Sequence, residues 1–268
     1  MKAPKKNLGQ NFLINRGICT RIADACAVDD NACVVEIGPG HGALTVLLVE
    51  ASQKVTALEL DADLIPELNN LAARCGNLEI LQCDALDIDL NKVIEEHFPV
   101  TSPVVICGNL PYYITSPIIM KVLESRTRAQ RAVFMVQKEA AQRLCAAEGS
   151  RECGASTLAV RWYSRPKILF DVSPGSFYPA PSVTSSVISL EILKQPPCKV
   201  NDERYMFSII RAAFSQRRKT AANAIASGLG ISKSDVCTVL ESIGLNAAIR
   251  AERITLEDYA SLSDRLKV

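Results

Sequence analysis

The feature of this sequence that most restricts its fold is a repeated alternation between short apolar runs and longer amphipathic stretches. The apolar runs, typical of buried parallel strands, cover residues 34–37, 54–60, 78–83, 104–107 and 132–136. Stretches with apolar residues at helical spacing lie between them, around residues 44–51, 64–71 and 118–123. The alternation occurs five times and therefore predicts a doubly wound α/β sheet with right-handed crossovers.

Two further strand-like stretches follow this alternating part. They cover residues 157–170 and 185–193, and the turn Ser173-Pro174-Gly175 separates them. Two consecutive strands without a helix between them indicate an antiparallel hairpin at the edge of the sheet. We therefore expect seven strands, mostly parallel, in a Rossmann-like α/β arrangement.

A change of pattern near residue 197 predicts a second domain. The run Gln195-Pro196-Pro197 breaks regular structure. Beyond it the periodicity is purely helical, around residues 202–215, 219–228, 232–243 and 255–265. We expect an α/β domain over residues 1–197, with a basic N-terminal arm, and a small all-helical domain over residues 198–268.

The nearly neutral total charge hides two opposite biases. The chain has 30 Lys and Arg against 29 Asp and Glu. Residues 199–268 carry a net charge of +3 and the remainder carries −2, and the segment from Arg204 to Ser234 holds six basic residues and no acidic one. A positive segment of this kind attracts the phosphates of a nucleic acid; the alternative is a solvated charged helix face.

Cysteine and histidine usage argues against disulfides and metal. The chain has ten cysteines but no Cys-x-x-Cys pair, and its two histidines are His41 and His97. These residues do not provide a zinc site at sensible spacing, so we expect free thiols in a reducing compartment. The segment Met1–Asn7 lacks the apolar core of a signal peptide, and no stretch of about 18 apolar residues occurs. We expect a cytoplasmic, membrane-free, metal-free monomer.

A glycine-rich segment joins the first predicted strand to the first predicted helix. It spans residues 36–43, and Gly38, Gly40 and Ala43 fit the spacing G-x-G-x-x-A of dinucleotide-binding turns. Glycines allow the chain to turn closely around a ligand. The motif does not choose between cofactors, and a plain connecting turn is the alternative.

Two carboxylates follow the next two predicted strands. Glu59 lies 21 residues after Gly38, where a carboxylate can accept both hydrogen bonds of a ribose diol. Asp84 ends the third strand, where it is suited to accept a hydrogen bond from an adenine amino group. Each acid has an alternative reading as a solvated strand end or a helix cap.

The segment after the fourth predicted strand separates the possible chemistries. It reads Asn109-Leu110-Pro111-Tyr112. The Asn109 side chain and a backbone carbonyl can together accept both hydrogens of one exocyclic amine, Pro111 fixes a rigid bend, and Tyr112 offers a flat face for stacking. A nicotinamide-dependent dehydrogenase needs no such segment.

These residues resemble the ribosomal RNA adenine N6,N6-dimethyltransferase family. The run Asn109–Pro117 is similar to the family's N-[LI]-P-[YF] signature, and residues 6–13 to its N-terminal cofactor segment. Residues 177–183 match its F-x-P-x-P-x-V element, and residues 213–220 its basic helical motif. Four separated motifs occur in the family's order.

The resemblance implies a fold, a cofactor and roles for particular residues. It implies a class I methyltransferase domain that uses S-adenosylmethionine without a metal. The implied cofactor-binding residues are Asn11, Leu13, Gly38, Gly40, Glu59, Asp84 and Asn109. The implied catalytic residues, which hold the target adenine, are Asn109, Leu110, Pro111 and Tyr112, with Phe177 against its other side. The expected phosphate contacts are Arg211, Arg217, Arg218, Lys219, Lys5 and Lys6.

The implied reaction is dimethylation of N6 in two adjacent adenosines of a hairpin loop near the 3′ end of small-subunit (16S) ribosomal RNA. The expected partner is this RNA within the small (30S) subunit or its assembly intermediate, with a role in subunit biogenesis. One alternative is the related large-subunit (23S) enzyme of macrolide resistance. A second is a ribosome-assembly or transcription factor that has the fold but no catalysis.

Overall fold

The structure, a computed structural model, describes residues 4–5, 8–29, 31–216 and 218–266. Contacts divide the chain into two units. The first consists of Met1–Ala141 and Ser164–Ile192, and the second of Gln142–Tyr163 and Leu193–Val268. This division differs from the expected boundary after residue 197, because residues 142–163 group with the C-terminal helices.

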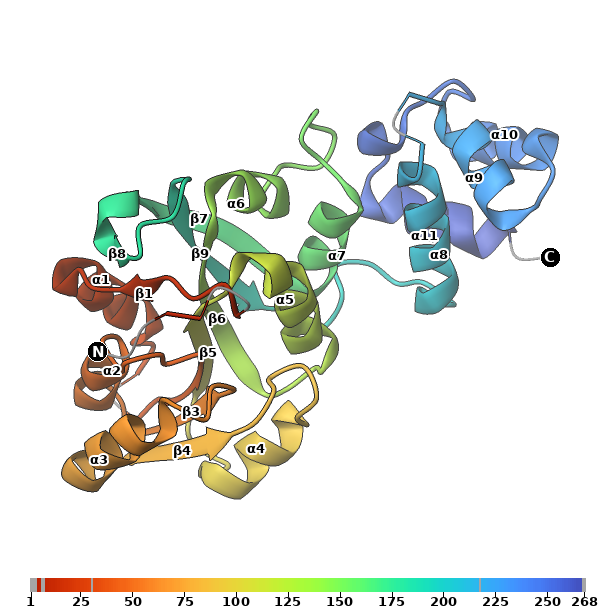
Figure 1. Cartoon of the computed structure of the whole chain (residues 1–268). Helices are drawn as coiled ribbons and strands as arrows, with labels where there is room; N and C mark the ends of the chain where they lie inside the picture. The colour runs from red at the N-terminus through yellow and green to blue at the C-terminus, as the bar shows by residue number, and fades with distance from the viewer. Residues whose placement is uncertain (1–3, 6–7, 30, 217, 267–268) are drawn as a thin grey trace. The chain divides into compact units, whose positions relative to one another are not determined.

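The first unit is built on a seven-stranded sheet with the order β4-β3-β2-β5-β6-β9-β7 (Figure 1). Its strands are β2 (Cys33–Ile37), β3 (Lys54–Glu59), β4 (Leu78–Gln82), β5 (Val104–Asn109), β6 (Ala129–Gln137), β7 (Ser164–Val172) and β9 (Ser185–Ile192). All pairings from β4 to β6 are parallel, whereas β9 runs antiparallel to both β6 and β7. The predicted mostly parallel sheet with an antiparallel edge hairpin is confirmed.

Helices cover both faces of this sheet (Figure 1). On one side lie α1 (Arg16–Cys26), α2 (Thr45–Ala51) and α3 (Ile65–Cys75), and on the other lie α4 (Leu90–His97) and α5 (Thr115–Glu124); α6 (Lys138–Leu144) follows β6. The strands β2 and β5 are buried along nearly their whole length. Strands covered on both faces must be apolar throughout, which explains the runs seen in the sequence.

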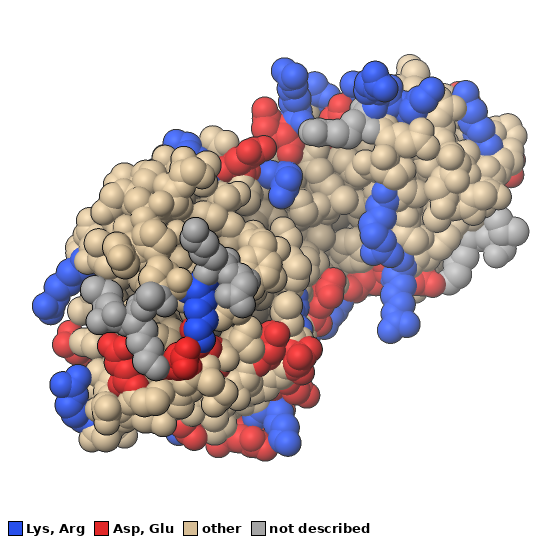
Figure 2. All heavy atoms as spheres, viewed as in Figure 1, with Lys and Arg blue, Asp and Glu red and all other residues tan. Residues whose placement is uncertain are grey.

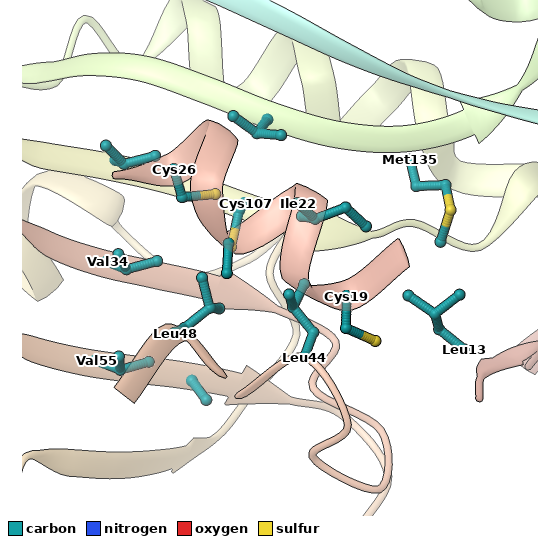
Figure 3. Packing of buried hydrophobic residues seen from close by; sticks show 14 of the residues in the cluster. Leu13, Cys19, Ile22, Cys26, Val34, Leu44, Leu48, Val55, Cys107 and Met135 are labelled. Carbon is teal, nitrogen blue, oxygen red and sulfur yellow. The ribbon is translucent and has the colours of Figure 1, made fainter. Parts of the chain in front are cut away.

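Aliphatic and sulfur-containing side chains fill the core between α1 and the sheet (Figure 3). Cys19, Ile22 and Cys26 of α1 face the sheet residues Val34 and Cys107, and each is at most 3% exposed. Burying an Ile or Val side chain contributes about 1.5–3 kcal/mol. All ten cysteines are free, and those in this core behave as small apolar residues.

A second, two-stranded sheet ties the N-terminal segment to the rest of the first unit. Strand β1 (Phe12–Leu13) pairs antiparallel with β8 (Phe177–Tyr178), with Phe12 opposite Tyr178 and Leu13 opposite Phe177. The short 3₁₀ helix η3 (Pro174–Ser176) leads into β8, and another, η2 (Tyr112–Ile114), follows β5. Two-residue strands carry no periodicity, so the sequence did not predict this sheet.

The second unit is helical. It contains α7 (Ala155–Tyr163), α8 (Glu203–Phe214), α9 (Ala221–Leu229), α10 (Lys233–Ser242), α11 (Leu256–Leu266) and the 3₁₀ helix η4 (Ala251–Arg253). The four helices predicted beyond residue 202 are confirmed. The strand predicted from residue 157 is wrong in its first half, because Leu158 and Trp162 are buried in the helical core with one helical turn between them. No helix among the described residues is long and apolar enough to cross a membrane.

Candidate functional site

A cavity opens at the carboxyl ends of the central parallel strands, where open α/β sheets bind their ligands. Its empty space, open solvent included, is about 810 Å³. The predicted site residues that line it are Asn11, Gly38, Gly40, Glu59, Asp84, Asn109, Leu110, Pro111 and Tyr112. The fold thus brings together residues almost 100 positions apart.

The glycine loop brings backbone atoms to the wall of this cavity. Gly38 and Gly40 have φ angles of 71° and 60°, a left-handed conformation that side chains disfavour. A Cβ atom on Gly40 would lie 2.9 Å from the ring of Phe12. The Gly40 N–H donates to Oε2 of Glu59 over 3.1 Å, which connects the loop to the end of β3.

The two predicted acids, Glu59 and Asp84, both line the cavity but differ in their exposure to solvent. Glu59 is 6% exposed and its Oε1 accepts from the Asp61 N–H over 2.8 Å. Burial raises the pKa of Glu59, against hydrogen bonds from the backbone of Asp61 and Gly40. Each carboxylate oxygen keeps a second lone pair for a ligand. Asp84 is partly exposed, and its Oδ1 accepts from the Leu86 N–H over 2.8 Å, which stabilises the turn after β4.

Asn109 ends β5 with its amide group oriented by the N-terminal segment. Its Nδ2 donates to the backbone carbonyl of Asn11 over 2.8 Å, and the Asn11 side chain donates to the Gly9 carbonyl over 3.2 Å. With the amide nitrogen used in this way, Oδ1 is the atom that remains to accept a hydrogen bond from a ligand.

The residues after Asn109 form a rigid wall. Leu110 is 1% exposed, and Pro111 accepts a hydrogen bond from the Thr115 hydroxyl over 3.1 Å. The hydroxyl of Tyr112 lies 2.7 Å from that of Ser185, the first residue of β9. Burial raises the pKa of Tyr112, so the phenol is neutral at physiological pH. The sequence did not single out Ser185, because only the sheet brings it to this edge.

Lys5 forms ion pairs that attach the N-terminal segment to the region after β3. Its ammonium lies 2.6 Å from Asp61 and 2.6 Å from Asp63, and Gln10 donates to Asp61 over 2.9 Å. Burial alone would raise the pKa of Asp61, but the bonds from Lys5 and Gln10 lower it overall. Two carboxylates already pair with this cation, and the phosphate contact expected at Lys5 stays a prediction.

A second cavity adjoins the first and carries two buried groups that the sequence did not indicate. It is lined by Glu36, His41, Leu13, Asn109 and the glycine loop. Oε2 of Glu36 and Nε2 of His41 are buried and have no hydrogen-bond partner among the described residues. Nδ1 of His41 lies 2.7 Å from Glu67. Glu36 has one sequence signal, a charge within an apolar strand, and its burial raises its pKa to about 7.

Phe177, which was expected to stack on the target adenine, lies in the hydrophobic core. It is 3% exposed and belongs to the core cluster that contains Leu13, whereas neither cavity includes it among its lining residues. Stacking of an adenine on Phe177 is thus corrected to a packing role. Leu13 packs in the same core and also lines the second cavity.

Three of the predicted RNA contacts lie in the described part of the helical unit. Arg211, in the last turn of α8, and Arg218 and Lys219, in the loop that follows, are exposed. On the face drawn in Figure 2, several Lys and Arg side chains project from this unit. Arg217 and Lys6 lie outside the described residues. Within those residues, no group of three or more His, Cys, Asp or Glu is arranged to hold a metal ion.

Comparison with known proteins agrees with this arrangement. The ribosomal RNA adenine dimethylase family matches residues 1–267. Ribosomal RNA small subunit methyltransferase A of Alkaliphilus oremlandii is 43% identical over 97% of this chain and 91% of that protein, and its counterpart in a Geobacillus species is 40% identical over 98% and 91%.

Solved structures extend the likeness to three dimensions. A dimethyladenosine transferase from Plasmodium falciparum is 26% identical, with a TM-score of 0.77 over 94% of this chain and 95% of that one. The 23S rRNA methyltransferase ErmE is 24% identical, with a TM-score of 0.70 over 96% and 100%, and shares the fold. With a family match over residues 1–267 and relatives at least 40% identical over almost its whole length, the chain belongs to the ribosomal RNA adenine dimethylase family.

Proposed function

We propose that this protein transfers methyl groups from S-adenosylmethionine to N6 of two adjacent adenosines in a hairpin loop near the 3′ end of small-subunit ribosomal RNA. The family match and the relatives named ribosomal RNA small subunit methyltransferase A support this reaction. We further propose that it acts as a cytoplasmic monomer on the small subunit or its assembly intermediate, and so takes part in subunit biogenesis.

The chemistry of the two cavities fits the methyl donor. When bound, S-adenosylmethionine supplies a methyl group activated by a sulfonium. Glu59 would accept hydrogen bonds from its ribose and Asp84 one from its adenine amino group, with Gly38 and Gly40 allowing close approach. The buried Oε2 of Glu36 has no partner in the described part of the chain, and such an acceptor suits a cationic ligand.

The observation that carries the proposal is the orientation of Asn109. Because its Nδ2 donates to the Asn11 carbonyl over 2.8 Å, its Oδ1 is left to accept from an adenine amino group. The lone pair of adenine N6 is delocalised into the ring, so the amine is a weak nucleophile. In the first transfer, acceptance of both amino hydrogens by Asn109 and the Leu110 carbonyl would let the nitrogen become tetrahedral as it attacks; in the second, N6 has one hydrogen left for these acceptors. In each transfer the methyl–sulfur bond breaks as the N–C bond forms, and the cationic nitrogen then loses one proton. Positioning and fixed dipoles would then supply most of the rate.

The target base must be unpaired or flipped to reach this cavity. The ring of Tyr112 would stack on it, and such stacking offsets about 1–3 kcal/mol of the cost of leaving the RNA stack. Arg211, Arg218 and Lys219 on the helical unit would hold phosphates of the surrounding RNA, as their exposure and the absence of acidic neighbours in the sequence support.

Labelled S-adenosylmethionine offered with unmethylated small or large subunits, followed by digestion of the RNA, tests the reaction and its substrate together. Dimethyladenosine from small subunits alone is the expected result. Product from large subunits alone would establish the macrolide-resistance type of reaction instead, and binding of small subunits without any product would establish a non-catalytic assembly factor.

Two variants test the assigned roles. Asn109→Ala should abolish methyl transfer while S-adenosylmethionine binding survives in part, and unchanged turnover would refute the mechanism.

Replacement of Arg218 and Lys219 by Glu should weaken RNA binding and flatten its dependence on salt, because fewer phosphate counterions are released. An unchanged slope of log affinity against log salt would contradict the assignment.

A further inference from the structure

The two aromatic residues of β8 have opposite environments. Phe177 is 3% exposed and packs in the core, whereas the next residue, Tyr178, is 55% exposed. Side chains alternate between the faces of a strand, so one of the two must point away from the core. The aromatic ring of this segment that a ligand can reach is Tyr178.

The register of the two-stranded sheet shows which side Tyr178 occupies. Phe12 lies directly opposite Tyr178, and Leu13 lies opposite Phe177. Directly opposed residues of an antiparallel pair have their side chains on the same face. Leu13 and Phe177 share the core cluster, as this rule requires.

The face shared by Phe12 and Tyr178 adjoins both ligand cavities through Phe12, whereas Leu13 on the other face reaches only the second. Phe12 lines both cavities, and its ring makes an edge contact with His41 at a centroid distance of 4.4 Å. Ile14, two residues after Phe12, lines the second cavity and is 50% exposed. Tyr178 itself lines neither of these cavities, but the register places its exposed ring on the same face of the two-stranded sheet as the cavity residue Phe12.

We infer that Tyr178 is a stacking platform for the unpaired nucleobase next to the target adenosine. This inference rests on the proposed function, in which two adjacent adenosines are methylated. While one adenine occupies the cavity, the phosphodiester link keeps its neighbour near the rim, and flipping has removed one of that neighbour's stacking partners. An exposed phenol ring replaces the lost partner irrespective of the base's sequence, because every base has a flat π-face.

The occupant is a base rather than a phosphate. The side chain of Tyr178 offers an aromatic face, and Ile14 and Val183, which follow β1 and β8 along the chain, are also exposed and apolar, with 50% and 40% exposure. A phosphate would use the Tyr178 hydroxyl as a donor, whereas a base uses its ring, and the variant Tyr178→Phe distinguishes the two. One aromatic ring with small apolar flanks matches the size of one base.

Kinetics on unmethylated small subunits test this platform through the variants Tyr178→Ala and Tyr178→Phe. The alanine variant should raise KM on the order of tenfold, the effect of losing one stacked base, whereas the phenylalanine variant should restore a KM close to that of the wild type. Val100→Ala is the matched control. Val100 is 86% exposed, but it precedes β5 at the amino ends of the parallel strands, whereas the cavity lies at their carboxyl ends. The control variant should change neither KM nor kcat.

A spectroscopic measurement separates stacking from a structural effect. Small subunits carrying 2-aminopurine at either of the two adenosines, introduced by ligation of a synthetic 3′ RNA segment, should show lower emission of the neighbouring base with wild-type protein than with Tyr178→Ala. Equal KM and equal emission for these two proteins would overturn the inference. Failure of the wild type to produce dimethyladenosine would instead overturn the proposed function, while the emission difference would still report on the platform.

Discussion

Gly108 offers a direct test of how closely the central strands must approach for the site to form. It lies in β5 opposite Ile37 of β2, one residue before Asn109. A Cβ atom at this position would lie 2.3 Å from the Ile37 carbonyl oxygen. The obstacle is backbone within the sheet, so no change of rotamer relieves it. Overpacking costs about 1–3 kcal/mol and sometimes more, and we expect Gly108→Ala to reach about 3 kcal/mol.

Thermal unfolding followed by circular dichroism measures this effect. At roughly 2–4 °C per kcal/mol for a domain of this size, Gly108→Ala should lower the Tm by about 6–12 °C. Methyl transfer should fall as well, because strand displacement moves Asn109. Gly175→Ala is the matched control: a Cβ atom on Gly175 would have no neighbouring atom within 4 Å, and the substitution should be neutral or slightly stabilising. Equal Tm values for the two variants would refute the steric argument.

Three other perturbations follow from the site. Asp61→Asn weakens the hold on the N-terminal segment and should raise the Kd for S-adenosylmethionine severalfold in calorimetry; an unchanged Kd would contradict the role given to Asp61. Burial raises the pKa of Glu36 from 4.5 to about 7, so between these pH values the folded state keeps a proton that the unfolded state has lost. The free energy of unfolding should therefore fall by up to about 3 kcal/mol as the pH rises from 4.5 to 7. Glu36→Gln should flatten this pH dependence of the free energy of unfolding, measured by urea titration between pH 5 and pH 8. An unchanged dependence would show that another group titrates. Ser185→Ala and Tyr112→Phe each remove the same hydrogen bond and should lower kcat/KM by similar factors, with the double variant no worse than either; multiplied losses would show independent effects.

The elements that the sequence predicted well are those whose periodicity reports burial directly. Strands β2 and β5 are buried along nearly their whole length and are mostly apolar, and α8 to α11 bury apolar residues in the helical core. The strand predicted from residue 157 was wrong in its first half because the apolar and β-branched residues there are compatible with a strand or a helix. Packing of Leu158 and Trp162 against the helical core made its first half a helix.

Within the site, the sequence identified residues that carry recognisable chemistry in a recognisable order. Gly38, Glu59, Asp84 and Asn109 all line the cavity, because each follows a parallel strand and these strands end at one edge. It missed Glu36, whose Oε2 is buried without a hydrogen-bond partner among the described residues and whose pKa is raised by burial against a lowering effect of Thr45. Burial depends on what packs over a strand, which no local pattern records.

The sequence by itself determined the α/β class, the helical C-terminal part and the motif that presents an amide oxygen to an amine. Only the tertiary structure decided which side chains reach a ligand. The pairing of β1 with β8 turned Phe177 into the core and left Tyr178 exposed opposite Phe12, and the tertiary fold brought Lys5 against Asp61. The physical reason is that hydrophobic periodicity reports each residue's local preference, whereas the face of a two-residue strand and the partner of a flexible cation are set by contacts with residues distant in the chain.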